Sequence, residues 1–497
     1  MFEISLVQLS AIFLIILLII KRPRVAENEP PLVPYTIPII GHTFSYFFNA
    51  KKFIKECREE YGDAFSIYVF GNIMTVLSNE AVSEMFRNHD DFDFIKAIHE
   101  DIPLHKFLIY NGGMTEEGNI FNAKTAREQF SGKLDINMPV VQKYLEIGMN
   151  KMLGDCSVPK TIYNAWFTIN EIIALPVTNI LVGEEAAAHD DIVKSFGILA
   201  FDMGHLLVIP PIFCFIHQKL HDFVATLPIR FGYNPVRYHR RIAMKRLRPV
   251  VEKRLRERKK LGDNYKSYND LLDFYMDQPN FDYSKPYNFH YHVDNLFIMV
   301  FASIHTTSRT AAVALYDMAA RPELVEELYE EAVKVDKERN GQLTVADVKK
   351  MIKLDSFVKE TLRHNDNITA LPHYVKPESF TFSSGLTIPK GRKIITYIED
   401  VLMSKENYGE DAEEFKPFRF VDQDSPATKV ERSYIIFGGG RHACPGRFFA
   451  INETKLFLHK FILRYKVTTQ SGKVEDKFRI GPFALPSRKA LVFENRV

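Results

Sequence analysis

The sequence predicts a mainly α-helical fold with a small β portion. Three observations favour this class: helical periodicity through most of the chain, a long apolar stretch without proline at residues 293–320, and only a few short segments of strand character. The chain has 497 residues, of which 46% are hydrophobic and 25% charged, so it can bury a large core. This composition excludes disordered, collagen-like and coiled-coil proteins.

Charge and cysteine content narrow the functional class. Lysine plus arginine (64) nearly balances aspartate plus glutamate (62), and the net charge of +2 gives no general field for a polyanion. Nucleic acid is therefore not an expected partner. The cysteines, Cys57, Cys156, Cys214 and Cys444, form no CxxC pair, so neither a disulfide framework nor a zinc ribbon is predicted. A reducing compartment that faces the cytosol fits best.

Residues 1–20 are predicted to form a transmembrane anchor. Glu3 is the only charge in residues 2–20, and Lys21, Arg22 and Arg24 follow directly. At about 1.5 Å per residue, a helix of this length just crosses a hydrocarbon core of roughly 30 Å. A cleaved signal peptide is the alternative, but it would carry its basic residues before the apolar run. Basic residues after the run place that flank in the cytosol, which predicts a single uncleaved anchor.

Residues 21–45 are predicted to be a stiff basic and proline-rich hinge, since Pro30, Pro31, Pro34 and Pro38 each fix φ. Residues 46–497 then form one catalytic domain, because no other stretch has the composition of a linker and no internal repeat is found.

Within this domain the elements follow from local pattern. Strands are expected at residues 65–69, 74–77, 374–382 and 386–395, the last interrupted at residues 389–391. A helix through the core is expected at residues 293–320. Pro322 stands where the first turn of the next helix begins, and Thr344 with Asp347 is typical of a capping box.

Residues 237–260 are the strongest basic run. Their apolar residues recur at roughly helical spacing, and acidic residues elsewhere cancel the charge. The solvated face of an amphipathic helix is therefore favoured over a segment that binds RNA or anionic lipid.

Residues 437–446, FGGGRHACPG, are the most informative segment. A lone cysteine is usually a small buried hydrophobic residue. Successive glycines before Cys444 and Pro445-Gly446 after it instead predict a tightly turning backbone that lies against something flat. Pro445 is expected to start a helix, and turn amides directed at the sulfur would stabilise a thiolate, which is a metal ligand.

This segment resembles the heme-binding loop FxxGxRxCxG of the cytochrome P-450 superfamily. Phe437, Gly440, Cys444 and Gly446 occupy the fixed positions, and His442 replaces the arginine, as in some fungal members. The resemblance implies the cytochrome P-450 fold, with heme b held between a long central distal helix and a proximal cysteine loop. It further implies that Cys444 is the axial thiolate ligand of the iron and that His442 binds a heme propionate.

Other segments resemble further landmarks of the family in its order. Glu360 and Arg363 match ExxR and Arg419 matches the later arginine, which implies a buried structural Glu-Arg-Arg cluster beside the heme. His373 falls where many members place another propionate-binding basic residue. The WxxxR helix has no counterpart around the sole tryptophan, and Lys124 or Arg127 is its nearest equivalent, serving a propionate or the reductase face.

Residues 302–307, ASIHTT, resemble the oxygen-activating segment of the long helix. Thr306 matches the threonine that relays protons, although a threonine inside a helix often returns its hydroxyl to the preceding turn. His305 replaces the family's acid. Imidazole can pass protons at cytosolic pH, so His305 is predicted to assist Thr306, and a purely structural histidine is the alternative.

The resemblance implies a monooxygenase that hydroxylates a C–H bond, fed with electrons from NADPH by NADPH–cytochrome P-450 reductase, with cytochrome b5 as a further candidate partner. It also implies a place in the endoplasmic reticulum membrane with the catalytic domain facing the cytosol. The expected pocket is apolar, which favours a lipophilic terpenoid or steroid as substrate. Its lining is expected from the loop at residues 102–110 and from Phe301, Ala302, Ile304, Ile368, Leu371, Phe483 and Leu485. Residues 206–213 either dip into the bilayer or form an ordinary core-packed loop.

Two alternatives stay open at this stage. One is a heme-thiolate isomerase or dehydratase that needs no reductase, against which Thr306 argues. The other is a membrane-tethered heme-binding protein without turnover, which only His305 in place of the acid favours.

Overall fold

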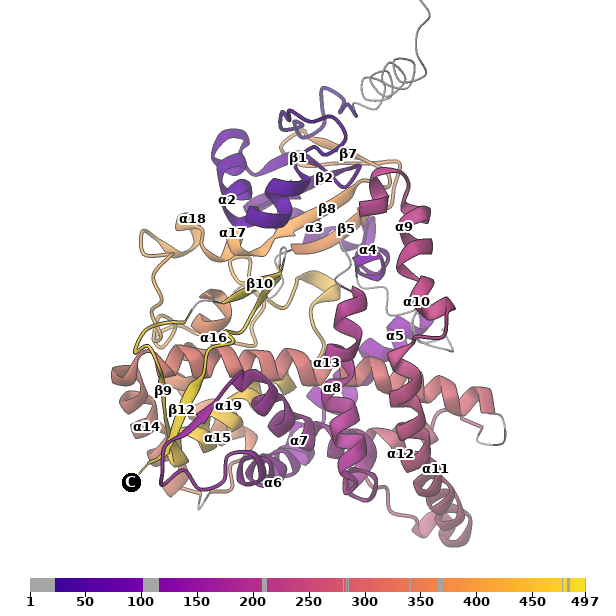
Figure 1. The fold of residues 1–497 in the computed structure, drawn as a ribbon, viewed down its shortest axis with the longest axis vertical. Helices are drawn as coiled ribbons and strands as arrows, with labels where there is room; N and C mark the ends of the chain where they lie inside the picture. Colours follow the sequence, from indigo (N-terminus) through magenta and orange to yellow (C-terminus); the bar gives the residue numbers. More distant parts are fainter. Residues whose placement is uncertain are drawn as a thin grey trace, which may run out of the picture.

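The computed structural model describes residues 23–101, 116–207, 212–279, 281–282, 284, 286–339, 341–364, 370–475, 477–480 and 483–496. The predicted anchor, the loop at residues 102–110 and Ile368 lie outside the described residues, as does the side chain of Phe483. The described chain is mainly α-helical with small sheets, as the sequence predicts (Figure 1).

The elements follow one another in three groups. The first group comprises α2 (Thr43–Tyr61), β1 (Ala64–Val69), β2 (Asn72–Leu77), α3 (Asn79–Arg87), η1 (His89–Asp91), β3 (Phe92–Asp93), α4 (Phe94–Asp101), α5 (Glu116–Thr125) and the π-helix η4 (Ala126–Ser131). The second comprises α6 (Leu134–Met152), β4 (Lys160–Ile162), α7 (Ala165–Ala187), α8 (Asp190–Leu207), η5 (Ile212–Phe215), α9 (Gln218–Ala225), α10 (Leu227–Arg230), α11 (Pro235–Leu261), η6 (Gly262–Asn264), α12 (Leu271–Met276) and α13 (Pro286–Ala319). The third comprises α14 (Pro322–Lys337), α15 (Val345–Lys350), α16 (Ile352–His364), β5 (Ala370–Val375), β6 (Ser379–Thr381), β7 (Thr387–Pro389), β8 (Lys393–Tyr397), α17 (Ile398–Leu402), α18 (Lys405–Tyr408), η7 (Gly440–His442), α19 (Arg447–Arg464), β9 (Tyr465–Thr469), β10 (Phe478–Ile480), β11 (Phe483–Leu485) and β12 (Leu491–Asn495).

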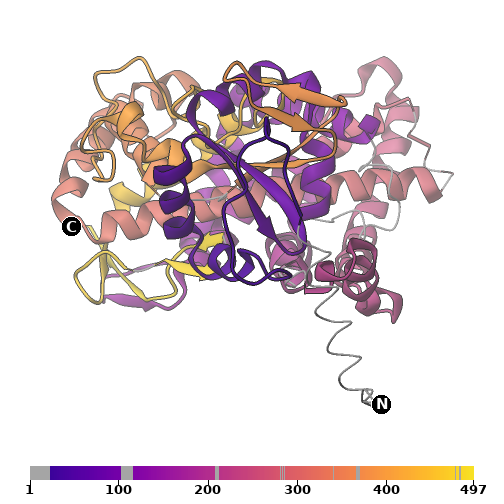
Figure 2. The same cartoon turned by 90° about the horizontal axis from the view of Figure 1, so that it is seen from above.

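The largest sheet has the order β1-β2-β8-β5-β3 and lies at one end of the helical body (Figure 2). β2 and β8 run parallel, with Val76 opposite Ile395, and the other neighbours are antiparallel. Part of the predicted hinge also joins this sheet, since the Val33 amide donates to the Ser66 carbonyl at 2.9 Å. Smaller sheets pair β4-β12-β9, β10-β11 and β6-β7.

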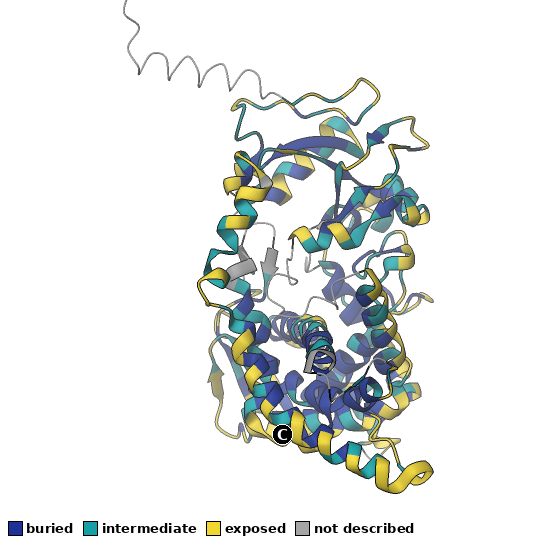
Figure 3. Ribbon diagram, turned by 90° about the vertical axis from the view of Figure 1, so that its right-hand side faces the viewer, coloured by how far each residue is buried: buried dark blue, intermediate teal, exposed yellow. Residues whose placement is uncertain are grey.

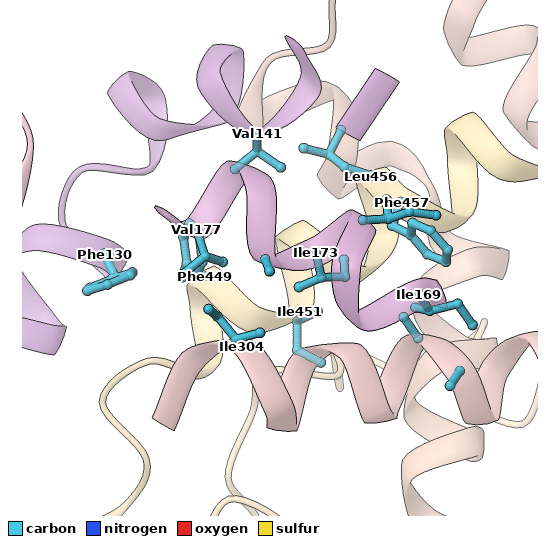
Figure 4. Packing of buried hydrophobic residues seen from close by; sticks show 14 of the residues in the cluster. Phe130, Val141, Ile169, Ile173, Val177, Ile304, Phe449, Ile451, Leu456 and Phe457 are labelled. Atoms are coloured by element: carbon cyan, nitrogen blue, oxygen red, sulfur yellow. The ribbon is translucent and has the colours of Figure 1, made fainter. Parts of the chain in front are cut away.

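The long helix α13 passes through the middle of the helical body and packs against α7, α8 and α19 (Figures 1 and 3). Figure 4 shows the core beside it, where side chains of α7, α13 and α19 interlock. Among the described helices, Ala165–Ala187 and Phe289–Ala319 are long and apolar enough to cross a membrane. Their most apolar windows are 72% and 61% buried inside the protein, as core helices are.

Most predicted elements are found, with shifted ends. The helix expected at 293–320 is α13, which begins at Pro286, and α14 begins at Pro322 as predicted. Thr344 and Asp347 form the expected capping box. The single strand expected at residues 374–382 is wrong: β5 ends at Val375 and β6 starts at Ser379. Pro377, which has no amide hydrogen, lies in the break.

Candidate functional site

The loop before Cys444 turns through two glycines that need a left-handed backbone. Gly438 has φ +74° and Gly440 has φ +57°, conformations that cost other residues strain. The turn closes when the Cys444 amide donates to the Phe437 carbonyl at 2.8 Å. This geometry places Cys444 between the end of the short helix η7 and the start of α19.

The flat group against the glycines is an aromatic ring of the protein itself. A Cβ atom on Gly439 would overlap the ring of Phe86 in α3, and one on Gly440 would come within 2.5 Å of the Phe86 carbonyl oxygen. The sequence predicts a close approach at these glycines, but it does not identify Phe86. Packing of α3 under the loop therefore explains Gly439 and Gly440 without a cofactor.

The sulfur of Cys444 lies among donors at the start of α19. Burial raises the pKa of the Cys444 thiol, while the backbone amides of Gly446 and Arg447 and the charge of Arg447 act in the opposite direction. The helix begins at Arg447, two residues later than the predicted start at Pro445, with Gly446 at the N-cap. Amides directed at a sulfur stabilise the thiolate form that binds metals.

Two side chains that sequence reasoning missed fasten this turn. The Arg447 guanidinium donates to the Cys444 carbonyl at 2.8 Å and to the Thr428 carbonyl at 3.0 Å. Ser131, the last residue of the π-helix η4, donates its hydroxyl to the Pro445 carbonyl at 2.7 Å. No sequence motif signals the bond from Ser131 to Pro445, because these residues lie more than three hundred positions apart in the chain.

Two predicted histidines converge from different elements. His373 on β5 and His442 on η7 both lie against the ring of Phe94, with centroid distances of 5.4 and 6.0 Å, and His89 lies 6.5 Å from His442. Burial lowers the pKa of His373 to about 4, and burial and His89 lower that of His442. Among the described residues, Nδ1 of His373 has no hydrogen-bond partner. A buried and a half-buried imidazole grouped in this way fit an anionic group that accepts hydrogen bonds from them.

The structure brings Glu360, Arg363 and Arg419 together. Arg363 donates to both carboxylate oxygens of Glu360, at 2.7 and 2.8 Å, and Arg419 donates to Glu360 at 3.2 Å. Arg363 also donates to the carbonyls of Leu402 and Ala412. Glu360 and Arg363 are fully buried, so this cluster ties α16 to the long segment that leads to the cysteine loop.

One face of the central helix is open where its neighbours are buried. Ala302 and Thr306 are exposed on this face, and Phe301 and Ser303 are partly exposed. The Thr306 hydroxyl donates to the Ala302 carbonyl at 2.7 Å, the bond to the preceding turn that the sequence left as an alternative. Ser303 makes the same kind of bond to Met299 at 2.6 Å.

Two residues predicted to take part in the site do not lie on the open face of this helix. Ile304 is fully buried and packs in the core shown in Figure 4, so it does not line the open face. His305 lies against Phe201, and its Nε2 accepts from the Ala200 amide at 3.2 Å. Burial lowers the pKa of His305 to about 3, which keeps the ring neutral at cytosolic pH. This packing favours the structural alternative for His305, because a 100° step per residue turns its side chain away from that of Thr306, and the proton relay stays a prediction.

The remaining predicted residues are spread around the site. Leu371 is buried on β5, and Leu485 is partly exposed on β11. Lys124 and Arg127 are exposed on α5 and η4, and Lys124 pairs only loosely with Glu128 at 3.9 Å. The structure does not bring either cation to His373 or His442.

The donor set fits a heme-thiolate centre. A cysteine sulfur at a helix start, with amides directed at it, suits the iron, and the two histidines against Phe94 suit the acidic edge of the cofactor. The helix α19 that begins three residues after Cys444 packs against α13, the helix that carries Thr306.

Comparisons with known proteins agree with this geometry. A sequence model of the family described as Cytochrome P-450 matches residues 30–492. Cytochrome P-450 monooxygenase 151 of Postia placenta is 26% identical over 90% of this chain and 88% of its own. Lanosterol 14-alpha demethylase of Mycosarcoma maydis is 25% identical over 93% of this chain and 87% of its own. Cytochrome P-450 monooxygenase terQ of Tolypocladium album is 34% identical over 55% of this chain and 49% of its own.

Proposed function

The chain belongs to the cytochrome P-450 family of monooxygenases, and from this premise we propose that it hydroxylates a lipophilic terpenoid or steroid through a heme-thiolate centre at Cys444. The observation that carries the proposal is the sulfur of Cys444, held at the start of α19 among the amides of Gly446 and Arg447. When bound, heme b supplies dioxygen activation and the transfer of one oxygen atom into a C–H bond.

The residues around Cys444 would hold the cofactor. Cys444 is the ligand of the iron, and Arg447 and Ser131 fix the turn that presents it. His442 and His373 would bind the propionates by donating hydrogen bonds from their ring N–H groups. The Glu360 cluster holds the backbone beside this loop.

We assign proton delivery to Thr306 on the central helix α13. Its hydroxyl lies on the open face of α13 and donates to Ala302, so it can turn that proton toward a bound ligand and keep an acceptor nearby. His305 takes no part, because it is neutral and bonded to α8. His305 is the only residue that favours a heme-binding protein without turnover, and its packing against α8 removes this support. Thr306 favours oxygen insertion over an isomerase activity.

The open face of α13 at Thr306 is proposed to line a pocket for an apolar substrate. Phe301, Ala302, Leu371 and Leu485 carry no charge and offer little to fix an ionic ligand. Phe483 and Ile368, which flank them in the sequence, belong to the same proposed lining. The similarity to a lanosterol demethylase supports a steroid-like or terpenoid substrate.

Electrons are proposed to come from NADPH through a separate reductase, with cytochrome b5 as a second donor. The surface beside the cysteine loop suits such a partner. Lys124 and Arg127 are exposed there, and Ser131, a few residues on, bonds the loop directly. Lys124 and Arg127 would form ion pairs with acidic residues on the surface of the reductase.

We also propose that residues 1–20 anchor the protein in the endoplasmic reticulum membrane and that one described surface rests on the bilayer. Phe48 in α2, Ile216 after η5 and Phe231 after α10 are exposed, Phe231 by 85%. The rings of Phe47, Phe70 and Phe215 join α2 to η5, with centroid distances of 6.4 and 5.7 Å. Exposed apolar residues are typical of a membrane contact, and these residues support a proposed substrate entrance near η5.

The test is turnover with isotopically labelled dioxygen. The full chain is expressed with a reductase, supplied with NADPH and a panel of terpenoids and steroids, and the products are analysed by mass spectrometry. We expect a hydroxylated product that carries one labelled oxygen atom. A product formed without NADPH and dioxygen would instead establish the isomerase alternative.

A further inference from the structure

A second site is formed where α11 meets the start of α13. A cavity of about 460 Å³ lies there, lined by Arg237, Arg240, Arg241, Met244, Arg248 and His290. Each lining position on α11 has another three or four residues away, so the set forms one stripe along the helix. His290 comes from the first turns of α13. The cavity therefore gathers basic side chains from two helices.

The charges on α11 are used differently on its different faces. On the faces away from the cavity, Arg246 pairs with Asp191 at 2.7 Å, Lys253 with Glu185 at 2.8 Å, and Arg258 with Asp273 at 2.8 Å. Within the part of the chain that the structure describes, Arg237, Arg241 and Arg248 have no acidic side chain at ion-pair distance. The stripe of α11 that lines the cavity thus carries three arginines, Arg237, Arg241 and Arg248, without an acidic partner among the described residues.

The inner wall of the cavity is held in place by buried contacts. Arg240 is only 6% exposed and forms an ion pair with Asp294, which is fully buried. Arg240 also donates to Nδ1 of His290 at 3.3 Å. Burial and the charges of Arg240 and Arg248 lower the pKa of His290 and keep its ring neutral. Because Nδ1 accepts a hydrogen bond from Arg240, the single ring proton is on Nε2. The wall thus presents an oriented N–H donor beside the arginines.

We propose that this cavity binds a phosphate group, and that its source is the headgroup of an anionic membrane lipid. Planar guanidinium groups match phosphate oxygens in paired hydrogen bonds. The first turn of α11 contains no acidic residue. The positive end of the helix dipole therefore favours the binding of an anion near the arginines at this end of the helix. The exposed Phe231 and Tyr233 immediately precede α11, and α9 and α10 lead into it along the same edge of the molecule (Figure 1). The site lies apart from Cys444 and does not depend on the proposed oxygen chemistry.

Arginine-selective labelling of the full chain tests the proposal directly. The protein is reconstituted into nanodiscs of phosphatidylcholine, with or without phosphatidic acid, and treated with phenylglyoxal. We expect labelling of Arg237, Arg241 and Arg248 to slow by about tenfold when the lipid exceeds its dissociation constant about tenfold. Arg256, exposed on the same helix, is the internal control and should react at an unchanged rate. Equal protection of Arg256, or no protection at the cavity, would overturn the proposal.

A matched pair of triple variants separates the lipid from a soluble phosphate. Arg237→Gln, Arg241→Gln and Arg248→Gln remove the cavity charges, whereas Arg256→Gln, Lys259→Gln and Lys260→Gln remove the same charge elsewhere on α11. Protection of the detergent-solubilised protein against thermal unfolding is measured with inorganic phosphate and with phosphatidic acid micelles. If only the first variant loses thermal protection by both inorganic phosphate and phosphatidic acid, the result supports a lipid headgroup as the ligand. If that variant loses only the protection by inorganic phosphate, the result supports a soluble phosphate ligand. Equal behaviour of the two variants would refute the site.

Discussion

At the scale of single residues, burial and helix geometry decide what each polar group can do. His305 and Thr306 are neighbours in the sequence, yet one is buried against α8 and the other lies on the open face of α13. A pattern match treats both as candidates for the same task. Only the direction of each side chain separates a packing histidine from a hydroxyl that can reach a ligand.

The variant Thr306→Ala is expected to uncouple electron use from product formation. NADPH consumption and heme content should persist, while product per NADPH falls by about tenfold or more and hydrogen peroxide rises, because the relay hydroxyl is lost. Peroxide and product are quantified in the same reaction. Thr310→Ala is the control, since Thr310 makes the same type of bond one turn later, to Thr306 at 3.0 Å. Undiminished coupling in Thr306→Ala would contradict the assignment.

The variant His305→Gln is expected to keep turnover and its pH profile, because glutamine can still accept from the Ala200 amide. Wild-type His305 has a pKa of about 3, against an ordinary value of 6.5, so it resists protonation when folded. The unfolded chain binds this proton first, and wild-type stability should therefore fall relative to His305→Gln as pH drops below about 6.5. Thermal unfolding across this range measures the difference. Loss of one limb of the pH–rate profile would restore His305 as a proton relay.

At the scale of elements, the sequence predicts what is local and misses what is distant. The apolar stretch at 293–320, the capping box at Thr344 and the glycines of the cysteine loop each carry their signal within a few residues. The sheet β4-β12-β9 has no such local signal in the sequence, because β4 and β12 lie more than three hundred residues apart. The same applies to Phe86 under Gly439 and to Ser131 on Pro445.

The variant Gly439→Ala is expected to damage the cysteine loop. Its Cβ would overlap the Phe86 ring, and either α3 or the loop must move, at a cost of about 1–3 kcal/mol. Heme retained per polypeptide and thermal stability should both decrease. Gly204→Ala is the control, because nothing lies within 4 Å of its added Cβ and alanine favours its helix. Full heme content and stability in Gly439→Ala would mean that Phe86 does not constrain the loop.

At the scale of the whole molecule, the proposed orientation joins the anchor, the exposed aromatic surface and the basic cavity. Phe48, Ile216 and Phe231 mark the surface proposed to meet the bilayer, and α11 begins four residues after Phe231. A membrane surface in this position would supply lipophilic substrate to the open face of α13. The sequence predicts the anchor, but the contiguity of the aromatic surface requires the fold.

Protease treatment of sealed microsomes tests the orientation. The catalytic domain should be digested without detergent, while a lumenal marker protein stays intact, because the basic flank at residues 21–24 predicts a body that faces the cytosol. Immunoblots of the domain and of the marker measure the two fractions. Protection of the domain until detergent is added would show the opposite orientation.

The absorption spectrum of the ferrous carbonyl complex tests the assignment of Cys444 most directly. The purified full chain, supplemented with heme, should show the strongly red-shifted Soret band that a thiolate opposite carbon monoxide produces, and Cys444→Ser should lose it. A colourless protein, or a spectrum of imidazole-bound type, would contradict the heme-thiolate centre.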